Sequence, residues 1–160
     1  MEQKERRQKV IRMLSNYKNN KVAIDMLKLD LQAVDALVRN SNMAVNYDQP
    51  AAGQTNRVIS KTENEVLLME QRRNEINSQI TLLQNQINKI DIALDNMTYP
   101  YRKLLELKYI EHKRWSEVYR ALNYSEEYIR TKINEVALDM MVAYVFPEVY
   151  YTGLFDGHDL

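Results

Sequence analysis

The chain has 160 residues and a formal net charge of zero, a length that suits one domain or a small domain with an extension. It has no cysteine, which excludes disulfides and thiolate metal sites, and its two histidines, His112 and His158, are too few for a metal site without other ligands. No apolar run approaches the roughly 20 residues that span a bilayer, and the charged start lacks the apolar core of a signal peptide. We therefore expect a cytoplasmic protein without metal, cofactor or membrane partner. Only three glycines and three prolines favour an all-α fold.

The first predicted element is a long N-terminal helix with one apolar seam. The seam residues recur at alternating steps of three and four, which is the spacing of a helix face. They are Val10, Met13, Tyr17, Ile24, Leu27, Leu31, Val34 and Val38, with the polar Asn20 among them. A basic cluster precedes them and is either a solvated helix start or a set of additional phosphate contacts. Its members are Lys4, Arg6, Arg7, Lys9 and Arg12.

Residues 62–97 predict a second long helix, because they carry a seam of about five heptads, which is typical of a coiled coil. Only Arg73 interrupts the seam. The other members are Val66, Met69, Ile76, Ile80, Leu83, Ile87, Ile90, Leu94 and Met97. We expect Tyr99-Pro100 to end the helix, since a residue before proline disfavours the helical conformation.

Residues 39–60 show little periodicity and predict a flexible loop between the two long helices. Two arrangements bury the same seam residues. Either the helices close an antiparallel hairpin within the chain, or each pairs with its counterpart in another chain. We favour the hairpin and assign residues 1–98 to an assembly region.

Residues 101–141 predict three short helices, and the last two have the spacing of a helix-turn-helix. Asn123 tolerates the left-handed conformation that ends a helix abruptly. Ser125 is a favourable N-cap, and Glu126 and Glu127 follow in the first turn, where the helix dipole favours acids. The third helix is expected to bury Ile129, Ile133, Val136 or Ala137, and Met140.

The last two helices resemble the fourth region of bacterial sigma factors, which binds promoter DNA. The matching residues are Trp115, Glu117, Val118, Leu122, Tyr124, Ser125, Ile129, Arg130, Lys132, Ile133 and Val136. The chain departs from the pattern at Asn123, where a glycine is usual, and at Tyr128, where a threonine is usual. Tyr119 replaces a small residue at the helix crossing, which implies a wider crossing or a ring that leaves sideways.

The arrangement of the whole chain resembles the RinA and ArpU-like regulators of late genes in phages and prophages of Gram-positive bacteria. The resemblance implies a sequence-specific DNA-binding activator that acts on double-stranded DNA in the bacterial cytoplasm, with a helix-turn-helix over residues 99–143. By position, the residues expected to face the major groove are Arg130, Thr131, Lys132 and Asn134, and the DNA-binding residues expected at the leading end of the helix are Glu126 and Tyr128. Arg114 and Arg120 are the expected phosphate contacts.

The charge distribution predicts that a single copy binds DNA weakly. Residues 101–141 hold eight basic and seven acidic side chains, and neutralisation of phosphates supplies most of the affinity of such domains. A homo-oligomer would correct this, and we favour a dimer.

The tail, residues 144–160, is aromatic and acidic. Tyr144, Phe146, Tyr150, Tyr151 and Phe155 either pack on the chain's own core or dock a partner such as RNA polymerase.

Two other functions fit parts of the sequence. A small terminase-like packaging subunit also combines a helix-turn-helix with long helices, although it usually places the DNA-binding unit first. A helical scaffold that binds only protein is the second. We find no catalytic constellation in the sequence and do not expect an enzyme.

Overall fold

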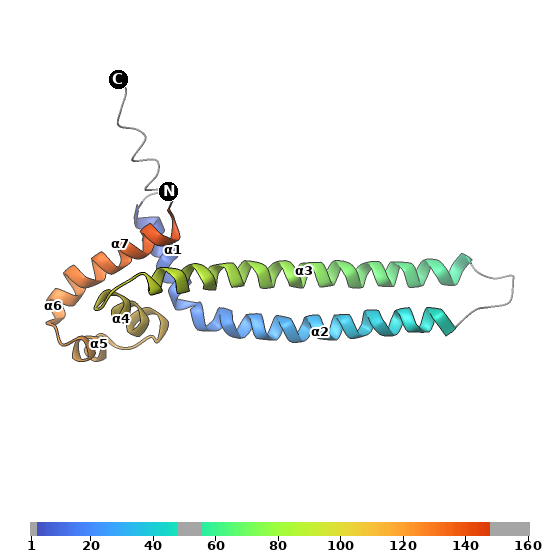
Figure 1. Cartoon of the computed structure of the whole chain (residues 1–160), viewed down its shortest axis with the longest axis horizontal. Coiled ribbons are helices and arrows are strands. Elements are labelled where there is room, and N and C mark those ends of the chain that lie inside the picture. The colour runs from blue at the N-terminus through green and yellow to red at the C-terminus, as the bar shows by residue number, and fades with distance from the viewer. Residues whose placement is uncertain (1–2, 48–55, 148–160) are drawn as a thin grey trace, which may run out of the picture. The chain divides into compact units, whose positions relative to one another are not determined.

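The computed structural model describes residues 3–47 and 56–147, and it describes side chains for residues 3–40 and 64–147. All regular elements in these ranges are helical, so the expectation of an all-α chain is confirmed for the described part. Figure 1 shows the elements in chain order from α1 to α7. They are α1 (Gln3–Ser15), α2 (Tyr17–Tyr47), α3 (Asn56–Asp95), α4 (Tyr101–Leu105), η1 (Glu106–Ile110), α5 (Trp115–Leu122), α6 (Glu126–Tyr128), η2 (Ile129–Ile133) and α7 (Asn134–Val145).

The elements η1 and η2 are single wide turns inside longer helices. In each, a backbone amide bonds to the carbonyl five residues earlier, as from Glu111 to Glu106 and from Asn134 to Ile129. The stretches 101–110 and 126–145 are therefore continuous helices with one widened turn each. Such turns insert one residue into the helical repeat and are frequent at functional sites.

The described residues form two compact units. The first comprises residues 3–20 and 85–147, and the second comprises residues 21–47 and 56–84. The long helices α2 and α3 thus contribute to both units. Each unit is described by itself below.

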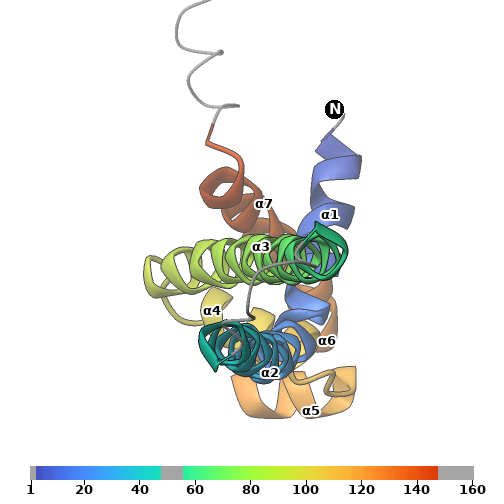
Figure 2. The same ribbon diagram turned by 90° about the vertical axis from the view of Figure 1, so that its right-hand side faces the viewer.

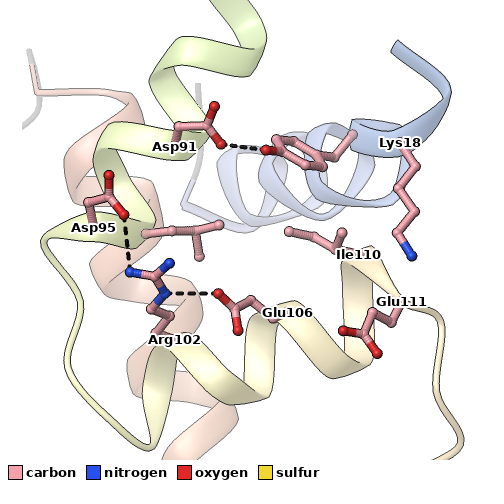
Figure 3. Close-up of a pocket in the computed structure, with 9 residues that line it drawn as sticks. Lys18, Asp91, Asp95, Arg102, Glu106, Ile110 and Glu111 are labelled. Carbon is pink, nitrogen blue, oxygen red and sulfur yellow. Dashed lines mark hydrogen bonds and ion pairs between the residues drawn. The ribbon is translucent and has the colours of Figure 1, made fainter. Parts of the chain in front are cut away.

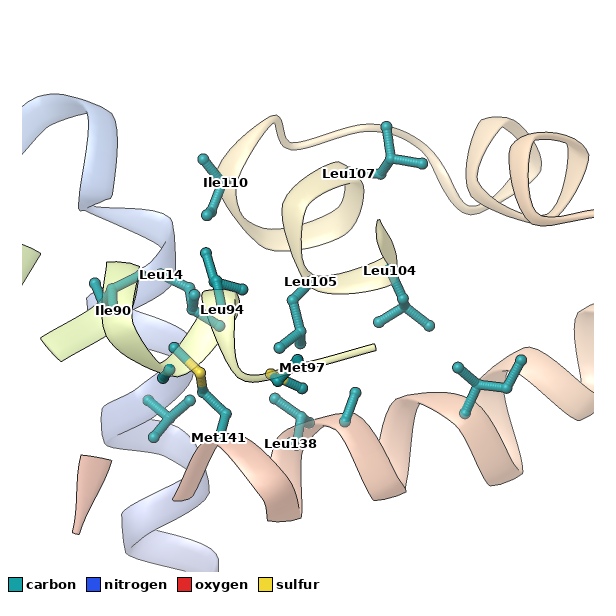
Figure 4. Packing of buried hydrophobic residues seen from close by; sticks show 14 of the residues in the cluster. Leu14, Ile90, Leu94, Met97, Leu104, Leu105, Leu107, Ile110, Leu138 and Met141 are labelled. Atoms are coloured by element: carbon teal, nitrogen blue, oxygen red, sulfur yellow. The ribbon is translucent and has the colours of Figure 1, made fainter. Parts of the chain in front are cut away.

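The first unit has one hydrophobic core, to which α1, the end of α3, α4, η1, α5, η2 and α7 contribute (Figure 4). The most enclosed side chains come from distant parts of the sequence: Leu14 of α1, Ile90 of α3, Leu105 of α4 and Met141 of α7 have no exposed surface. The helices α1 and α7 lie side by side (Figure 2). The core therefore fixes the short helices of residues 101–145 against α1 and α3.

The second unit contains the later part of the first predicted seam and the earlier part of the second. Ile24 of α2 and Ile76 of α3 are buried, and the other described seam residues of this unit, Arg73 apart, are half-buried. An ion pair joins the two helices, with Arg73 Nε 3.0 Å from Asp35 Oδ1. Arg73, which interrupts the heptads in sequence, therefore makes a contact between the helices.

The N-terminal helix is bent where the sequence predicted one continuous helix. Asn16 separates α1 from α2, although the backbone bonds from Asn16 to Arg12 (3.0 Å) and from Asn20 to Asn16 (2.8 Å) remain. The bend has a physical reason: Val10 and Leu14 belong to the core of the first unit, where α1 packs on α7 and η1. The heptad pattern continues across Asn16, but its first members contact different helices.

The irregular stretch is shorter than the predicted loop of residues 39–60. α2 continues to Tyr47 and α3 begins at Asn56. The residues at these two helix ends lack a periodic apolar pattern, yet they contain neither proline nor glycine, so each helix can continue through them. Residues 48–55, the centre of the predicted loop, lie outside the described residues.

The second long helix ends before the predicted boundary at Tyr99-Pro100. α3 ends at Asp95, and the amide of Met97 bonds to Leu94 O (3.1 Å), three residues back. The side-chain amide of Asn96 donates to Ile92 O (2.8 Å). An asparagine that bonds to the backbone in this way competes with the helix, which explains the earlier end.

Candidate nucleic-acid interface

A tight turn joins α5 to α6, and it lies at the residues that the sequence predicted for it. Asn123 has φ 58° and ψ 39°, the left-handed conformation, and its amide bonds to Tyr119 O at 2.9 Å. Ser125 is extended, and its Oγ accepts from the Tyr128 amide at 3.3 Å. Glu126 and Glu127 occupy the first turn after it. The predicted left-handed turn at Asn123, the predicted N-cap at Ser125 and the predicted first-turn positions of Glu126 and Glu127 are confirmed.

The side chain of Glu117, the third residue of α5, caps the start of this helix. The backbone amide of Arg114 donates to Glu117 Oε2 at 2.9 Å, which is one half of a capping box. The guanidinium of Arg114 has no acceptor atom and so cannot supply the other half. The side chain of Arg114 is left exposed at the edge of α5.

The apolar sides of both helices face the core. Val118 and Leu122 of α5 are buried, as are Ile129 and Ile133 of η2 and Ala137 of α7. Of the two alternatives at the next helical turn, Ala137 is therefore the buried residue, and Val136 is 42% exposed. Met140 is half-buried, and Met141 takes the enclosed position beside it. The widened turn η2 accounts for this shift, because it adds one residue to the repeat.

The continuous helix of residues 126–145 is the second helix of the predicted helix-turn-helix. Its outer face carries Tyr128, Arg130, Thr131 and Lys132, and all four are exposed. Arg130 is engaged at both sides: its Nη2 lies 2.8 Å from Glu126 Oε1, and its guanidinium carbon lies 5.2 Å from the centre of the Trp115 ring. The Tyr128 ring lies 5.7 Å from that of Tyr124. The structure thus brings Glu126, Tyr128 and Arg130 together at the leading end of the helix.

Tyr119 is the main departure from the sigma pattern. Its side chain is half-buried and packs against the hydrophobic core. Burial raises the pKa of Tyr119, and the negative charge of Glu126 raises it further. The phenol therefore lies near the charged side chains of Glu126 and Arg130.

Two residues predicted to contact bases have their polar groups engaged within the protein. Thr131 Oγ1 donates to Glu127 O at 2.7 Å, although the side chain remains exposed. Asn134 is half-buried, and its Oδ1 accepts from the Tyr109 hydroxyl at 2.9 Å. Burial also raises the pKa of Tyr109. Asn134 thus faces η1, and the expectation that it shares the exposed face is wrong. The reason is again η2, after which the helix has turned further than the ordinary repeat predicts.

The remaining predicted residues are exposed cations. Arg114 and Arg120 lie in or next to α5, and Lys132 lies on the second helix. Among the described residues, none of the three has an ion-pair partner. These side chains are thus available to a phosphate.

Sequence reasoning missed Lys108 as a neighbour of this face. Its ammonium lies 4.8 Å from the centre of the Trp115 ring and donates to Lys113 O at 3.2 Å. Trp115 is therefore contacted by two cations, Lys108 and Arg130, at distances typical of cation–π pairs. The lysine lies in η1, and no spacing in the sequence indicates that this turn approaches Trp115.

Sequence reasoning also missed the partners of Arg7. The guanidinium bonds bidentately to Asp139, with Nε at 2.8 Å and Nη2 at 2.6 Å, and forms an ion pair with Glu135. The bond to Asp139 raises the pKa of Arg7, and the bond to Glu135 raises it further. One member of the basic cluster therefore holds α1 against α7 and is not available to DNA.

A polar pocket of about 410 Å³ lies elsewhere in the first unit, between α3, α4 and the start of α2 (Figure 3). Arg102 bridges its two sides, at 3.0 Å from Asp95 and 2.8 Å from Glu106. The Tyr17 hydroxyl donates to Asp91. Three of its four acids therefore have partners within the protein. Among the described residues, no cluster of acids and histidines has the arrangement of a metal site.

A comparison with known protein families identifies the family of this chain. Residues 6–141 match the model of a family described as a protein of unknown function (DUF722), and the chain belongs to this family. No curated protein and no solved structure matched the chain. Within the described residues, no helix is long and apolar enough to cross a membrane.

Proposed function

We propose that this protein is a sequence-specific DNA-binding transcriptional regulator, an activator of phage or prophage late genes. In this proposal residues 99–143 form a helix-turn-helix of the sigma region 4 type, and the long helices form an antiparallel hairpin. The second helix, which begins at Glu126, enters the major groove. The observation that carries the proposal is the exposed face of this helix, where Arg130, Thr131 and Lys132 lie opposite a fully buried apolar face.

The contacts of this face suggest different roles for its members. Lys132 is exposed and unpaired among the described residues, so it suits a phosphate or a guanine edge. Arg130 is held by Glu126 and Trp115, which would preorganise its guanidinium for a bidentate contact with a guanine. Tyr124 and Tyr128 present ring surface at the leading end of the helix, which suits contact with a thymine methyl.

The cations around this face suit the DNA backbone. Arg114 and Arg120 flank α5, and Lys108 lies against Trp115. Phosphate contacts position a protein on DNA, and base contacts give the sequence preference. Because acids nearly balance the bases in this region, a single copy should bind DNA weakly, and we propose that two copies bind together. As an activator, the protein would have RNA polymerase as a further partner.

The proposal is tested with Lys132→Ala and the matched control Lys89→Ala. Both lysines are exposed and neither has a partner among the described residues, but Lys89 lies in α3. The DNA is taken from upstream of the genes that neighbour the gene of this protein. If Lys132 contacts a base, we expect Lys132→Ala to weaken binding by about 1–3 kcal/mol. If it contacts a phosphate, the slope of the logarithm of the binding constant against the logarithm of the salt concentration should fall in magnitude by about one. The control should bind as the unmodified protein does. Equal binding by both variants would contradict the proposed interface.

A second variant tests the role of the acid on this face. Glu126→Gln removes a negative charge that would lie near phosphates, and it loosens the hold on Arg130. If the face binds DNA, the loss of repulsion should strengthen non-specific binding at low salt. The same variant should reduce discrimination between the specific site and other DNA, because Arg130 is less ordered.

Two measurements on the unmodified protein distinguish the alternative functions. A protein that binds no DNA at low salt would be a scaffold, and a mass in solution that corresponds to a ring of several copies would indicate a packaging subunit.

A further inference from the structure

The helix α1 carries a basic groove on the side opposite to its buried residues. The groove is open, has a volume of about 440 Å³, and is lined by Lys4, Glu5, Gln8, Lys9 and Arg12. All five residues are exposed, and three cations stand against one acid. Among the described residues, none of the three cations has an ion-pair partner. The groove therefore offers positive charge to an acidic partner.

The described chain ends at the edge of this groove. Phe146 follows α7 and is half-buried, and the ammonium of Lys9 lies 5.3 Å from the centre of its ring. Pro147 is the last described residue, so residues 148–160 continue from this point. These 13 residues can span up to about 40 Å, whereas the groove extends over about 12 Å of helix from Lys4 to Arg12. The whole groove is within reach of the tail.

The composition of residues 148–160 is complementary to the groove. They contain three acids, Glu148, Asp156 and Asp159, and neither lysine nor arginine. Carboxylates form charge-assisted hydrogen bonds with lysine and arginine. The same residues contain the aromatic side chains Tyr150, Tyr151 and Phe155, and aromatic rings attract lysine and arginine through their faces. The contact of Phe146 with Lys9 is one such pair at the start of the series.

We propose that residues 148–160 bind in the basic groove of α1 of the same chain. The acids pair with the three cations, and the aromatic rings lie on the apolar stems of the lysine and arginine side chains. Glu148 is two residues beyond Phe146 and so stays within about 7 Å of it, which suits Lys9. Because a short tether gives an effective concentration on the order of millimolar, contacts that are weak one by one suffice to hold the tail.

A DNA backbone is the other anion that the groove could bind, and two observations favour the tail. The acid Glu5 lies among the cations of the groove and would repel phosphates along a continuous backbone. In addition, α1 meets the second helix at Glu135 and Asp139, beyond the residues 126–132 that form the candidate nucleic-acid face. The groove therefore does not belong to that face, and its occupant is a separate question from the proposed function.

The first test is cross-linking of the full chain with a carbodiimide, which joins an amine to a carboxylate only where the two are in contact. We expect links from Lys4 or Lys9 to Glu148, Asp156 or Asp159, identified by mass spectrometry. The matched control within the same molecule is Lys89, which is exposed on α3. A tail that forms no link to α1, or that links to Lys89 in equal yield, would overturn the proposal.

The second test neutralises the tail in the full chain with Glu148→Gln, Asp156→Asn and Asp159→Asn together. We expect acetylation of Lys4 and Lys9 by an amine reagent to become several-fold faster than in the unmodified chain, and that of Lys89 to stay unchanged.

The matched control variant carries the same change of charge on exposed acids of the second unit, Asp25→Asn, Glu65→Gln and Glu70→Gln. It should leave the acetylation of all three lysines as it was. Equal rates in the tail variant and in the unmodified chain would contradict the proposal, and so would a slowing at Lys9 that appears only when DNA is added. The experiments without DNA give their result whether or not the protein binds DNA.

Discussion

The two units bury their apolar residues to very different extents. Among the described residues, only Ile24 and Ile76 of the second unit are fully buried, whereas the first unit encloses side chains from α1, α3, α4, η1, α5, η2 and α7. The second unit also exposes many large apolar side chains. They are Val22, Met26, Leu29, Leu37, Leu67, Leu68 and Leu82.

Geometry explains the difference. Two long helices share a single line of contact, so each can hide only the narrow stripe that faces its partner. In the first unit several short helices and the ends of two long ones meet, and they enclose residues on all sides. A part of the chain with one seam therefore exposes more large aliphatic side chains than a part with a closed core, where Ile92 and Val136 are the only such side chains exposed among the described residues.

The largest predicted effect is in the closed core. Leu105 has no exposed surface, and Leu105→Ala leaves a cavity that rigid neighbours cannot fill. We expect the free energy of unfolding to fall by about 3–5 kcal/mol, the upper part of the range for such changes. Denaturant unfolding followed by circular dichroism measures this. The matched control is Leu82→Ala on exposed surface, for which a change under about 0.5 kcal/mol is expected.

The corresponding change in the second unit should cost less. Ile76 is 1% exposed, but it lies in a seam with water close on either side. The two helices can move together after Ile76→Ala, so we expect a loss of about 2 kcal/mol, the lower end of the range. The measurement is the same unfolding experiment. A loss as large as that of Leu105→Ala would remove the contrast between the two units.

Periodic features of the sequence predicted much of the fold. The heptads identified the less exposed side of both long helices, because burial along a helix follows its repeat. Asn123 and Ser125 identified the turn between α5 and α6, because each favours a local backbone conformation whatever lies around it. Such features depend on neighbours in sequence, which is why they could be predicted.

Contacts between distant residues could not be predicted in the same way. Arg7 belonged to a basic cluster that suggested phosphate contacts, yet its bonds to Glu135 and Asp139 depend on how α1 packs on α7. The position of Asn134 depends on the widened turn η2, which has no signature in sequence that we recognise. The exposure of Arg114, Arg120 and Lys132 was predicted, and the internal bonds of Thr131 and Asn134 were not.

The contact between α1 and α7 provides a third prediction. Arg7 makes a bidentate, partly buried bond to Asp139, a geometry that contributes more than most surface ion pairs. Arg7→Met keeps an unbranched apolar stem and removes the charged guanidinium. We expect the free energy of unfolding of the first unit to fall by about 1 kcal/mol, as measured by thermal unfolding. In Asp139→Asn, the added Arg7→Met should have a smaller effect, and full additivity of the two changes would show that the bond contributes little.

The smallest predicted effect concerns the turn that precedes the second helix. Asn123 is left-handed, which asparagine tolerates and alanine does not, so Asn123→Ala should lower the free energy of unfolding by up to about 1 kcal/mol. Asn123→Gly should be neutral within a few tenths of a kcal/mol, because glycine adopts this conformation without strain and loses more entropy on folding. Thermal unfolding of the two variants side by side provides the measurement. If alanine is tolerated as well as glycine, the turn can relax out of its left-handed conformation. The orientation of α6 relative to α5 would then come from the buried contacts of Val118, Leu122 and Ile129 and not from the turn.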